Sequence, residues 1–471
     1  MANPGALCFA SDVRTMGSLP EYSPHRVEPT LMTASHLSRR SALKRMAAAS
    51  FAAPFAFRAH ATAAPSETVY HASFGASSMA WGDIQSLTAS KNLKLVAVAD
   101  VDLSKTAEVL KRFPDVKVYQ DWRELLDKEK GLNSVNISTP DHMHAPITMS
   151  ALQRGLNVYT QKPLTQTIYE ARRLTEVARE KKVVSQMGIQ IHSHVVHRTV
   201  VATIQSGAIG KVKEVHSWSG KDWGDRNPRP TRQDPIPAKL NWDGWLGVAA
   251  ERPFIAGYYH PGEWRKRLDF GTGTFGDMGC HILDPVYGAL ALTMPKSVRS
   301  DGDIPNADSW GLDNRVRYVF PGTPHTTEEL ALHWYNGSLR PSDEIKALIG
   351  ALPLAGQGSI YIGTEGVLYS PYIGNPVLLP AEKFQHVKLP EPGGNDHYLQ
   401  YVEACRGNGK TSAPFEYSGP LTEMVLLGCL STRFHKTTLE WDAANLKVTN
   451  VPEANAFVRK QYRKGWEVEG L

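Results

Sequence analysis

Short apolar runs alternate with longer amphipathic segments between Val69 and Gly188, and this alternation constrains the fold more than any other feature of the sequence. The segments in between, such as SKTAEVLKRF (104–113) and IYEARRLTEVAREKK (168–182), space their apolar residues as helices do. Strands separated by helices form βαβ units with a parallel sheet covered on both faces. The sequence therefore predicts an α/β protein that begins with a doubly wound parallel sheet. The six expected strands are 69–74, 93–100, 116–119, 134–138, 156–160 and 183–188.

The pattern changes near residue 210. Longer and often alternating runs follow, linked by Gly/Pro-rich loops, at 211–220, 314–320, 327–335, 358–370 and 439–450. Alternation with a period of two is typical of antiparallel strands. We therefore expect a C-terminal α/β domain with a large open, mainly antiparallel sheet. The expected division is 1–64 for a leader, 65–188 for the first domain and 189–471 for the second, whose C-terminal tail packs back on the body.

The first 64 residues differ from the rest in charge. They hold seven Lys/Arg and three acids, so most of the net charge of +5 of this 471-residue chain lies there. Arg39 and Arg40 precede an apolar run, Met46–Phe57, and then small residues up to Ala61. This order is typical of an export signal, and the arginine pair resembles a twin-arginine signal, which serves proteins exported already folded. We therefore expect a periplasmic or otherwise extracytoplasmic protein.

Two alternatives for the leader are a basic tail without structure and a membrane anchor. Twelve apolar residues are too few to span about 30 Å of hydrocarbon, so an anchor is disfavoured and no stable membrane span is expected. The remainder of the chain is close to neutral. It therefore gives no electrostatic basis for a nucleic-acid partner.

SFGASSMA (73–80) follows the first expected strand, where a Rossmann domain that binds a dinucleotide carries G-x-G-x-x-G. Only the first glycine, Gly75, is present, and an ordinary strand-to-helix turn is the alternative. Asp100 ends the second strand, where an acid accepts hydrogen bonds from ribose hydroxyls and repels a 2′-phosphate. The Ser77 hydroxyl can itself donate to a phosphate at a helix N-terminus. We therefore predict binding of NAD, with NADP less favoured, by Gly75, Ala76, Ser77, Ser78, Met79 and Asp100.

Polar residues also follow the next two strands, in STPDHMHAP (138–146) and TQKPLTQT (160–167). Both segments face the carboxyl edge of the sheet, where open α/β folds bind ligands. A lysine there, Lys162, can hold a substrate hydroxyl or accept its proton. A solvated loop lysine is the alternative.

A second polar constellation, DFGTGTFGDMGCHILDP, spans residues 269–285. Asp277 and His281 are four residues apart, so they project from one face if this segment is helical. Such a pair can relay a proton or bind a sugar hydroxyl. A metal site is the alternative, but no further His/Cys/Asp cluster at ligand spacing supports it, and no metal is predicted. His192, His194 and His197 fit a polar helix start near the cleft better than a closed metal site.

Together these motifs resemble the glucose–fructose oxidoreductase/inositol dehydrogenase/rhizopine-catabolism (Gfo/Idh/MocA) family, in its exported branch. The resemblance runs from Val69 to about Trp466. It is carried by ISTPDHMHA, QKPL, QSGAIGKV, GTFGDMGCHILD and the tail LEWDAANLKVTNVPEANAFVRKQYRKGW. It implies an N-terminal Rossmann domain, a C-terminal α/β domain whose open sheet forms oligomers, and a nicotinamide cofactor.

The resemblance also implies residue roles. Lys162 matches the lysine of the family's E-K-P motif, whose glutamate is Gln161 here, and Asp277 and His281 match its D-x-x-x-H motif. Thr139, Pro140 and His144 match the loop at the nicotinamide. Gln161 keeps a hydrogen-bonding group but loses a charge near the lysine. Cofactor contacts are therefore also expected from Thr139, Pro140, His144 and Gln161.

The leading functional hypothesis is an NAD-dependent oxidoreductase that acts on a CH–OH group of a sugar, with Lys162, Asp277 and His281 as catalytic residues. The expected sugar contacts are Gln190, His192, Trp264 and Arg265, since sugar faces stack on aromatic rings and hydroxyls need polar partners. A glycosidase that oxidises the sugar transiently and then eliminates the aglycone is the first alternative. A carbohydrate- or protein-binding member without catalytic activity is the second.

Overall fold

The structure is a computed structural model that describes residues 68–471, within a unit of the chain that begins at Ala64. The predicted export signal lies outside these residues. In the part described, no helix combines the length and apolar character that a membrane span requires.

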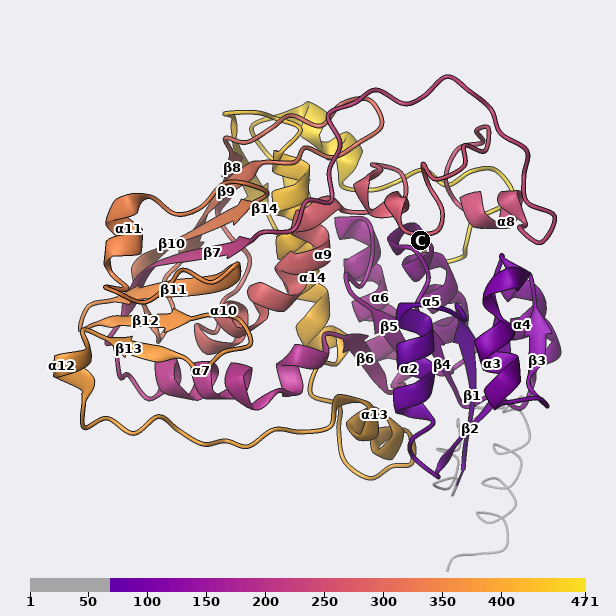
Figure 1. Cartoon of the computed structure of the whole chain (residues 1–471), viewed down its shortest axis with the longest axis horizontal. Helices are drawn as coiled ribbons and strands as arrows, with labels where there is room; N and C mark the ends of the chain where they lie inside the picture. Colours follow the sequence, from indigo (N-terminus) through magenta and orange to yellow (C-terminus); the bar gives the residue numbers. More distant parts are fainter. Residues whose placement is uncertain (1–67) are drawn as a thin grey trace, which may run out of the picture. The chain divides into compact units, whose positions relative to one another are not determined.

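The first half forms a six-stranded sheet in the order β3-β2-β1-β4-β5-β6, with all neighbours parallel (Figure 1). This is the strand order of the Rossmann fold. The predicted strands are confirmed to within two residues at each end. The strands are β1 (Val69–Phe74), β2 (Leu93–Ala99), β3 (Lys117–Tyr119), β4 (Ser134–Ile137), β5 (Asn157–Gln161) and β6 (Ser185–Gly188).

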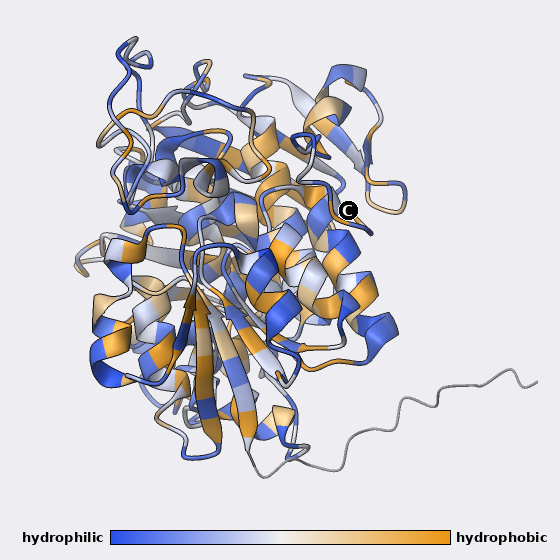
Figure 2. Ribbon diagram, turned by 90° about the vertical axis from the view of Figure 1, so that its right-hand side faces the viewer, coloured by the Kyte–Doolittle hydropathy of each residue, from blue (hydrophilic) through white to orange (hydrophobic). Residues whose placement is uncertain are grey.

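Helices connect these strands, and local capping explains where several of them begin. Helix α6 starts after Thr167, whose side chain accepts from the amide of Glu170 while the Glu170 carboxylate accepts from the amide of Thr167. This capping box satisfies two amides that the helix leaves unpaired. Figure 2 shows mostly apolar strands and helices with a polar side. The helices of this half are α2 (Met79–Leu87), α3 (Ala107–Arg112), α4 (Trp122–Lys128), α5 (His144–Gln153) and α6 (Ile168–Lys181), with short η1 (Leu103–Lys105) and η2 (Asp141–Met143).

The second half contains a nine-stranded sheet in the order β13-β12-β11-β7-β10-β9-β8-β14-β15. Strands β7 and β10 are parallel and the other neighbours are antiparallel, which confirms the mainly antiparallel prediction. The strands are β7 (Val212–Ser219), β8 (Ser297–Ser300), β9 (Asn314–Pro321), β10 (Thr326–Asn336), β11 (Gln357–Gly363), β12 (Val367–Ser370), β13 (Val377–Leu379), β14 (Thr438–Asp442) and β15 (Lys447–Val448). The sequence did not predict β8 or β13, because runs this short show no periodicity.

One face of this sheet packs on helices α9 (Gly273–Ile282) and α14 (Phe415–Ser431) and contributes Tyr318, Leu332 and Trp334 to the main core. Figure 1 shows both helices between the two sheets. The outer face carries a smaller cluster around Trp218 and Tyr335. The remaining helices are η3 (Gln190–Ser193), α7 (Val195–Gln205), α8 (Trp242–Leu246), η4 (Glu263–Lys266), α10 (Asp284–Ala289), α11 (Asp343–Ala347), α12 (Ala381–Phe384), α13 (His397–Cys405) and η5 (Pro452–Phe457).

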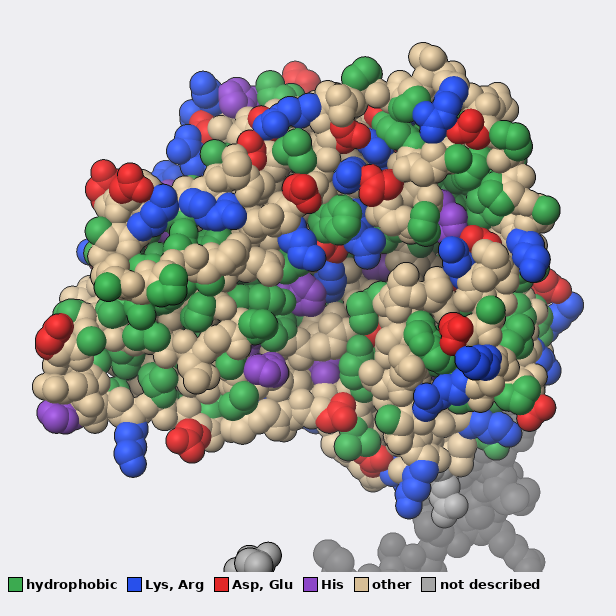
Figure 3. All heavy atoms as spheres, viewed as in Figure 1, with side chains coloured by type: hydrophobic (Ala, Val, Ile, Leu, Met, Phe, Trp, Pro, Cys, Tyr) green, Lys and Arg blue, Asp and Glu red, His purple; other side chains and the backbone are tan. Residues whose placement is uncertain are grey.

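Helix α13 belongs to the second half in sequence but packs on the first half. Its Tyr401 hydroxyl lies 2.7 Å from Ser134 Oγ at the start of β4, and its Tyr398 hydroxyl donates to Asp83 of α2. The C-terminal tail makes similar contacts, since the Tyr462 hydroxyl donates to Glu170. Figure 3 shows acidic and basic side chains mixed over one face, with no field of a single sign.

Candidate functional site

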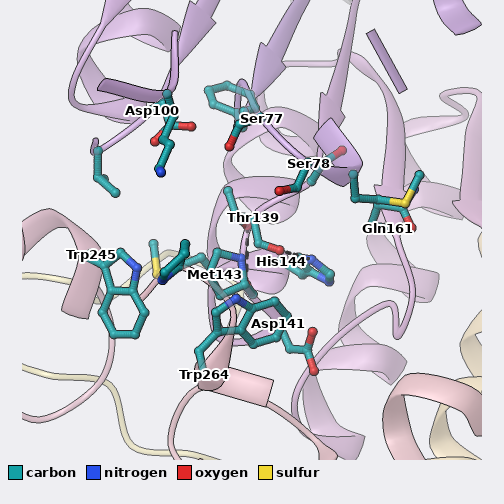
Figure 4. A pocket seen from close by; sticks show the side chains of 18 of the residues that line it. Ser77, Ser78, Asp100, Thr139, Asp141, Met143, His144, Gln161, Trp245 and Trp264 are labelled. Carbon is teal, nitrogen blue, oxygen red and sulfur yellow. Dashed lines mark hydrogen bonds between the residues drawn. The ribbon is translucent and has the colours of Figure 1, made fainter. Parts of the chain in front are cut away.

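A cavity of about 280 Å³ lies at the carboxyl edge of the parallel sheet. Its wall runs from the loop between β1 and α2, past the ends of β2, β4 and β5, to η4 and α9 of the second half. Figure 4 shows Asp100 and Ser77 at one end, Asp141 and Trp264 at the other, and Thr139 with His144 between them. The cavity therefore occupies the position where parallel α/β sheets bind ligands, and it extends into the second half.

The turn between β1 and α2 has room for an anionic group. Gly75 has a φ of +100°, and a Cβ there would lie 2.8 Å from the carbonyl oxygen of Ser138, so a side chain would be both strained and obstructed. Ser78, the N-cap of α2, has φ 52° and ψ −120° and gives the helix no side-chain cap. Ser77, Ser78 and Met79 line the cavity. The helix start, with its uncapped amides and positive dipole end, fits the phosphates of a dinucleotide.

Asp100 is tied to this turn by backbone hydrogen bonds. Its Oδ2 accepts from the amide of Ala76 at 3.0 Å, and its Oδ1 accepts from the amide of Asp102 at 2.9 Å. Burial raises its pKa. Each carboxylate oxygen can accept further hydrogen bonds, so Asp100, which lines the cavity, fits the ribose role predicted for it. Ala76 is buried and acts through its amide alone.

Thr139, Pro140 and His144 line the middle of the cavity. The His144 ring joins the loops after β4 and β5, because Nε2 lies 2.9 Å from the carbonyl oxygen of Thr139 and Nδ1 lies 2.7 Å from that of Pro163. Burial lowers the pKa of His144 to about 4. The ring is therefore neutral near pH 7 and carries one N–H, so it donates to one of these two carbonyl oxygens while packing between the loops.

Lys162 and Asp277, 115 residues apart in the chain, meet at the far end of the cavity. Lys162 Nζ donates to Asp277 Oδ1 at 2.7 Å and to the Asp277 carbonyl oxygen at 3.0 Å, and both residues line the cavity. Arg265 Nε lies 3.5 Å from the same Oδ1. Burial alone would raise the pKa of Asp277, but Lys162 and Arg265 hold it well below its usual range. Asp277 is therefore a buried carboxylate that positions a lysine ammonium at the cavity wall.

His281 lies one helical turn beyond Asp277 in α9, as the spacing predicts. It is absent from the cavity lining, and its Nδ1 is buried without a hydrogen-bond partner. Burial, with the charge of Lys162, lowers the pKa of His281 to about 3. The ring is therefore neutral at pH 7. His281 therefore neighbours the Lys162–Asp277 pair but does not line the cavity.

The four predicted sugar contacts separate into two groups. Trp264 and Arg265 line the cavity, and the Arg265 guanidinium lies 4.3 Å from the centre of the Trp264 ring. Gln190 lies outside the lining and donates to the hydroxyls of Tyr159 and Tyr398. His192 also lies outside it, with Nδ1 2.9 Å from Asp284 Oδ2. Only Trp264 and Arg265 are thus placed beside Lys162 and Asp277.

Gln161 is explained by a residue that the sequence analysis did not identify. Its Nε2 lies 2.9 Å from both carboxylate oxygens of Asp83, and its Oε1 accepts from the amide of Lys162. Asp83 is fully buried in α2, also accepts from Ser138 and Tyr398, and has a pKa raised by burial to about 6. The negative charge that the family's glutamate would place at position 161 is therefore carried by Asp83, which hydrogen-bonds to Gln161.

Asp141 is a second residue that the sequence analysis missed. It lines the cavity, and its Oδ2 accepts from the Thr272 hydroxyl at 2.7 Å. Burial raises the pKa of Asp141 to about 7, so it can exchange a proton near neutral pH. The sequence did hold a clue to Asp141, because it directly follows Thr139 and Pro140, which were assigned to the loop at the nicotinamide.

The strand order, the glycine turn and the acid after β2 define a protein with a Rossmann domain that binds NAD(P) and a C-terminal α/β domain. Two family models match consecutive parts of the chain, "Oxidoreductase family, NAD-binding Rossmann fold" over residues 72–189 and "Oxidoreductase family, C-terminal alpha/beta domain" over 190–325. Together they cover more than half of its 471 residues. The chain belongs to the Gfo/Idh/MocA oxidoreductase family, which confirms the resemblance at the level of the family, while the exported branch stays a prediction.

Curated relatives are similar at low identity. Levoglucosan dehydrogenase of Pseudarthrobacter phenanthrenivorans is 25% identical over 191 residues, 41% of this chain and 40% of that protein. The scyllo-inositol 2-dehydrogenase (NADP(+)) IolW of Bacillus subtilis is 22% identical over 204 residues, 43% of this chain and 47% of that protein. The chain thus aligns with less than half the length of either relative.

Among solved structures, the WlbA dehydrogenase from Bordetella pertussis, in complex with NADH and UDP-GlcNAcA, is 13% identical with a TM-score of 0.58. The match covers 80% of this chain and 99% of that one. At this identity the likeness shows the fold, and the fold agrees with the two domains described above.

Proposed function

We propose that this protein is an NAD-dependent oxidoreductase that acts on a CH–OH group of a sugar or sugar derivative and keeps its cofactor tightly bound. The observation that carries the proposal is the Lys162–Asp277 ion pair in the same cavity as the Gly75 turn and Asp100. One end of the cavity suits the adenosine and phosphates, and the other presents a positioned ammonium group. The relatives named above, a levoglucosan dehydrogenase and an inositol dehydrogenase, support a polyhydroxylated substrate.

NAD, when bound, supplies the hydride acceptor for the substrate carbon. Lys162 Nζ binds the substrate oxygen and moves a proton between that oxygen and itself, and Asp277 fixes the position of Nζ throughout. Arg265 partly neutralises the negative charge of Asp277. The carboxylate therefore repels a developing alkoxide on the substrate less strongly. The flat Trp264 ring offers a face on which a sugar ring can stack.

The preference for NAD over NADP rests on Asp100. Its carboxylate is held at the cavity wall by two backbone amides, so it cannot turn away from a 2′-phosphate without breaking them. Lys105 also lines the cavity, and its positive charge would favour NADP. Titrations with NAD and with NADP give the ratio of the two affinities, which reports how Asp100 and Lys105 together set the cofactor preference.

We also propose that the protein is exported folded to the periplasm with its cofactor, and that it forms homo-oligomers through the open sheet. The first part rests on the arginine pair, Arg39 and Arg40, and on the expectation that free NAD is scarce outside the cytoplasm. The second rests on the resemblance, which implies that the open sheet of the C-terminal domain forms oligomers.

The test is to purify the processed protein from the periplasm, denature it and measure the released nucleotide by mass spectrometry. Sugars are then assayed singly and in donor–acceptor pairs, without added NAD. We expect close to one NAD per chain, and turnover only with a pair, because NADH formed in place must be reoxidised in place. Sucrose-gradient or light-scattering analysis of the same sample gives the oligomeric state.

Two results would overturn the proposal. Release of an aglycone from a single glycoside, with no net NADH, would assign the glycosidase activity instead. A folded protein that neither contains nor binds NAD would indicate a binding protein without catalytic activity.

A further inference from the structure

Three potential metal ligands lie together on the outer face of the nine-stranded sheet, away from the cavity. Glu214 and His216 are two residues apart on β7, so their side chains share a face. His333 on β10 is the register partner of His216 across the parallel pair. Among residues 68–471, these three side chains form the one group of three or more His, Cys, Asp or Glu whose ligand atoms lie within 4.8 Å of one another.

Both histidines approach one carboxylate oxygen. Nε2 of His216 and Nε2 of His333 each lie 3.1 Å from the same oxygen of Glu214, Oε1. The two imidazole rings are stacked, with centroids 4.6 Å apart and an angle of 8° between planes, so one ring must tilt for both lone pairs to reach the same cation. Separations of about 3 Å between donor atoms are those expected around a cation bound at about 2.0–2.2 Å.

His216 presents an unused donor atom to this space. The residue is 4% exposed, and its Nε2 makes no hydrogen bond although Glu214 Oε1 lies 3.1 Å away. A buried ring nitrogen without a hydrogen-bond partner calls for an explanation. Its other nitrogen, Nδ1, lies 3.0 Å from the Tyr335 hydroxyl. That contact fixes the ring orientation in the way that outer groups orient histidines bound to metals.

The chemistry of the three side chains suits the same role, because imidazole nitrogens and carboxylate oxygens are both common ligands of Zn²⁺. Glu214 adds one negative charge and is one-third exposed.

We propose that Glu214, His216 and His333 form a binding site for a divalent transition-metal cation, Zn²⁺ in particular, on the outer face of the sheet. Two imidazole nitrogens and one carboxylate are a donor set that Zn²⁺ accepts. The cation links β7 to β10, the one parallel pair in this sheet. The site shares no residue with the cavity and does not depend on the proposed oxidoreductase activity.

Arg317 opposes the cation. It is the register partner of His333 on β9, and its charge contributes to the lowered pKa of His333. Replacing Arg317 by glutamine removes this repulsion without removing a ligand. The variant Arg317→Gln should therefore bind the metal more tightly than the wild-type chain.

The experiment uses the full chain without a histidine tag, freed of metal by chelation and then titrated with Zn²⁺ and with Co²⁺ as a spectroscopic probe. We expect one Zn²⁺ per chain, and Co²⁺ bands of a low-coordinate site that Zn²⁺ abolishes. His333→Gln and Glu214→Gln should each weaken binding at least about tenfold, given that loss of an outer contact alone costs about 10–100-fold. His386→Gln, at an exposed histidine outside the cluster, is the matched control and should bind as the wild type does.

Circular dichroism and thermal unfolding verify that each variant is folded. Absence of Zn²⁺ binding by the folded wild-type chain would overturn the proposal. Equal affinities in wild-type, His333→Gln and Glu214→Gln chains would overturn it as well, because the metal would then be bound elsewhere.

Discussion

The two ends of the cavity are built in different ways. The nucleotide end uses residues close in sequence, Gly75 to Asp100, and fixes them through backbone groups such as the amide of Ala76. The reaction end uses side chains from distant segments, with Lys162 paired to Asp277 115 residues later. Backbone contacts tolerate changes of side chain, which explains how Ser77 and Ala80 can stand where the fingerprint has glycines. Side-chain pairs depend on the identity of both partners.

This difference predicts that substitutions at the two ends have separable effects. Changes at the nucleotide end should act on cofactor affinity, and changes at the reaction end should act on turnover. Lys162→Met and Asp100→Ala test the separation, and Gln161→Glu and Ser78→Gly test how residues at the two ends are held in place.

The largest effect is expected for Lys162→Met. The side chain keeps its length but loses the group that we propose binds and protonates the substrate oxygen, so turnover should fall by roughly two to four orders of magnitude. NAD affinity should stay close to that of the wild type. Steady-state kinetics on an active sugar and calorimetric titration with NAD measure the two quantities.

Lys105→Met is the matched control, because Lys105 lines the same cavity at its nucleotide end. It should alter nucleotide affinity more than turnover. If Lys162→Met turns over at the wild-type rate, Lys162 has no part in proton transfer and the separation fails.

The next largest effect is expected for Asp100→Ala. The substitution removes the acceptor for two backbone amides as well as for the ribose, and hydrogen bonds to a charged group contribute about 1.5–3 kcal/mol each. NAD affinity should fall at least about tenfold, with a smaller preference over NADP. Turnover at saturating NAD should change little. Calorimetry with both nucleotides checks this, with the exposed Asp115→Ala as control, and unchanged NAD affinity would contradict the cofactor position.

A smaller effect, on stability, is expected for Gln161→Glu. The change restores the family's glutamate but sets a second carboxylate against the buried Asp83, 2.9 Å from the present amide nitrogen. An unpaired buried charge costs about 3–5 kcal/mol, and part of this is relieved by protonation of Asp83. The double variant Gln161→Glu/Asp83→Asn exchanges the two groups and should recover most of the loss. Urea denaturation of the wild type, the two single variants and the double variant gives the interaction energy between positions 161 and 83. An interaction energy of zero would refute the pairing of Gln161 with Asp83.

The pH dependence follows from the raised pKa of Asp83. Its folded-state pKa of about 6 lies above the unfolded value of 3.8, so its contribution to stability is complete below pH 3.8 and is lost as the pH rises through 6. The free energy of unfolding of the wild type should therefore decline relative to Asp83→Asn between about pH 4 and pH 6. A difference that stays constant over this range would assign the proton to another group.

The smallest effect is expected for Ser78→Gly. A φ of 52° with ψ −120° is a conformation that strains any residue with a Cβ, at a cost of about 1–3 kcal/mol. Glycine removes the strain but adds entropy to the unfolded chain, so the net gain should be about 0.5–2 kcal/mol. Ser77→Gly, where no positive φ occurs, should give no such gain. Equal urea midpoints for Ser78→Gly and the wild type would show that the turn carries no strain.

The sequence predicted the parallel sheet to within two residues at each strand end, because regular alternation of strands and helices is a local property. It also predicted that Asp277 and His281 share a helix. It missed Asp83, since only the fold brings that residue of α2 against Gln161 and Tyr398. It missed the Glu214, His216 and His333 cluster for the same reason, as β10 returns beside β7 more than 100 residues later.

The packing of α13 on the first half has a consequence for synthesis of the chain. Asp83 and Tyr398 are 315 residues apart, and Tyr401 reaches back 267 residues to Ser134. While the chain is on the ribosome, the nucleotide-binding half emerges long before these two tyrosines do. During that interval Asp83 lacks one of its donors, so the nascent Rossmann half cannot reach its final hydrogen bonding until the last part of the chain is made. The hydrogen bonds around Asp83 and Ser134 are thereby completed only near the end of translation.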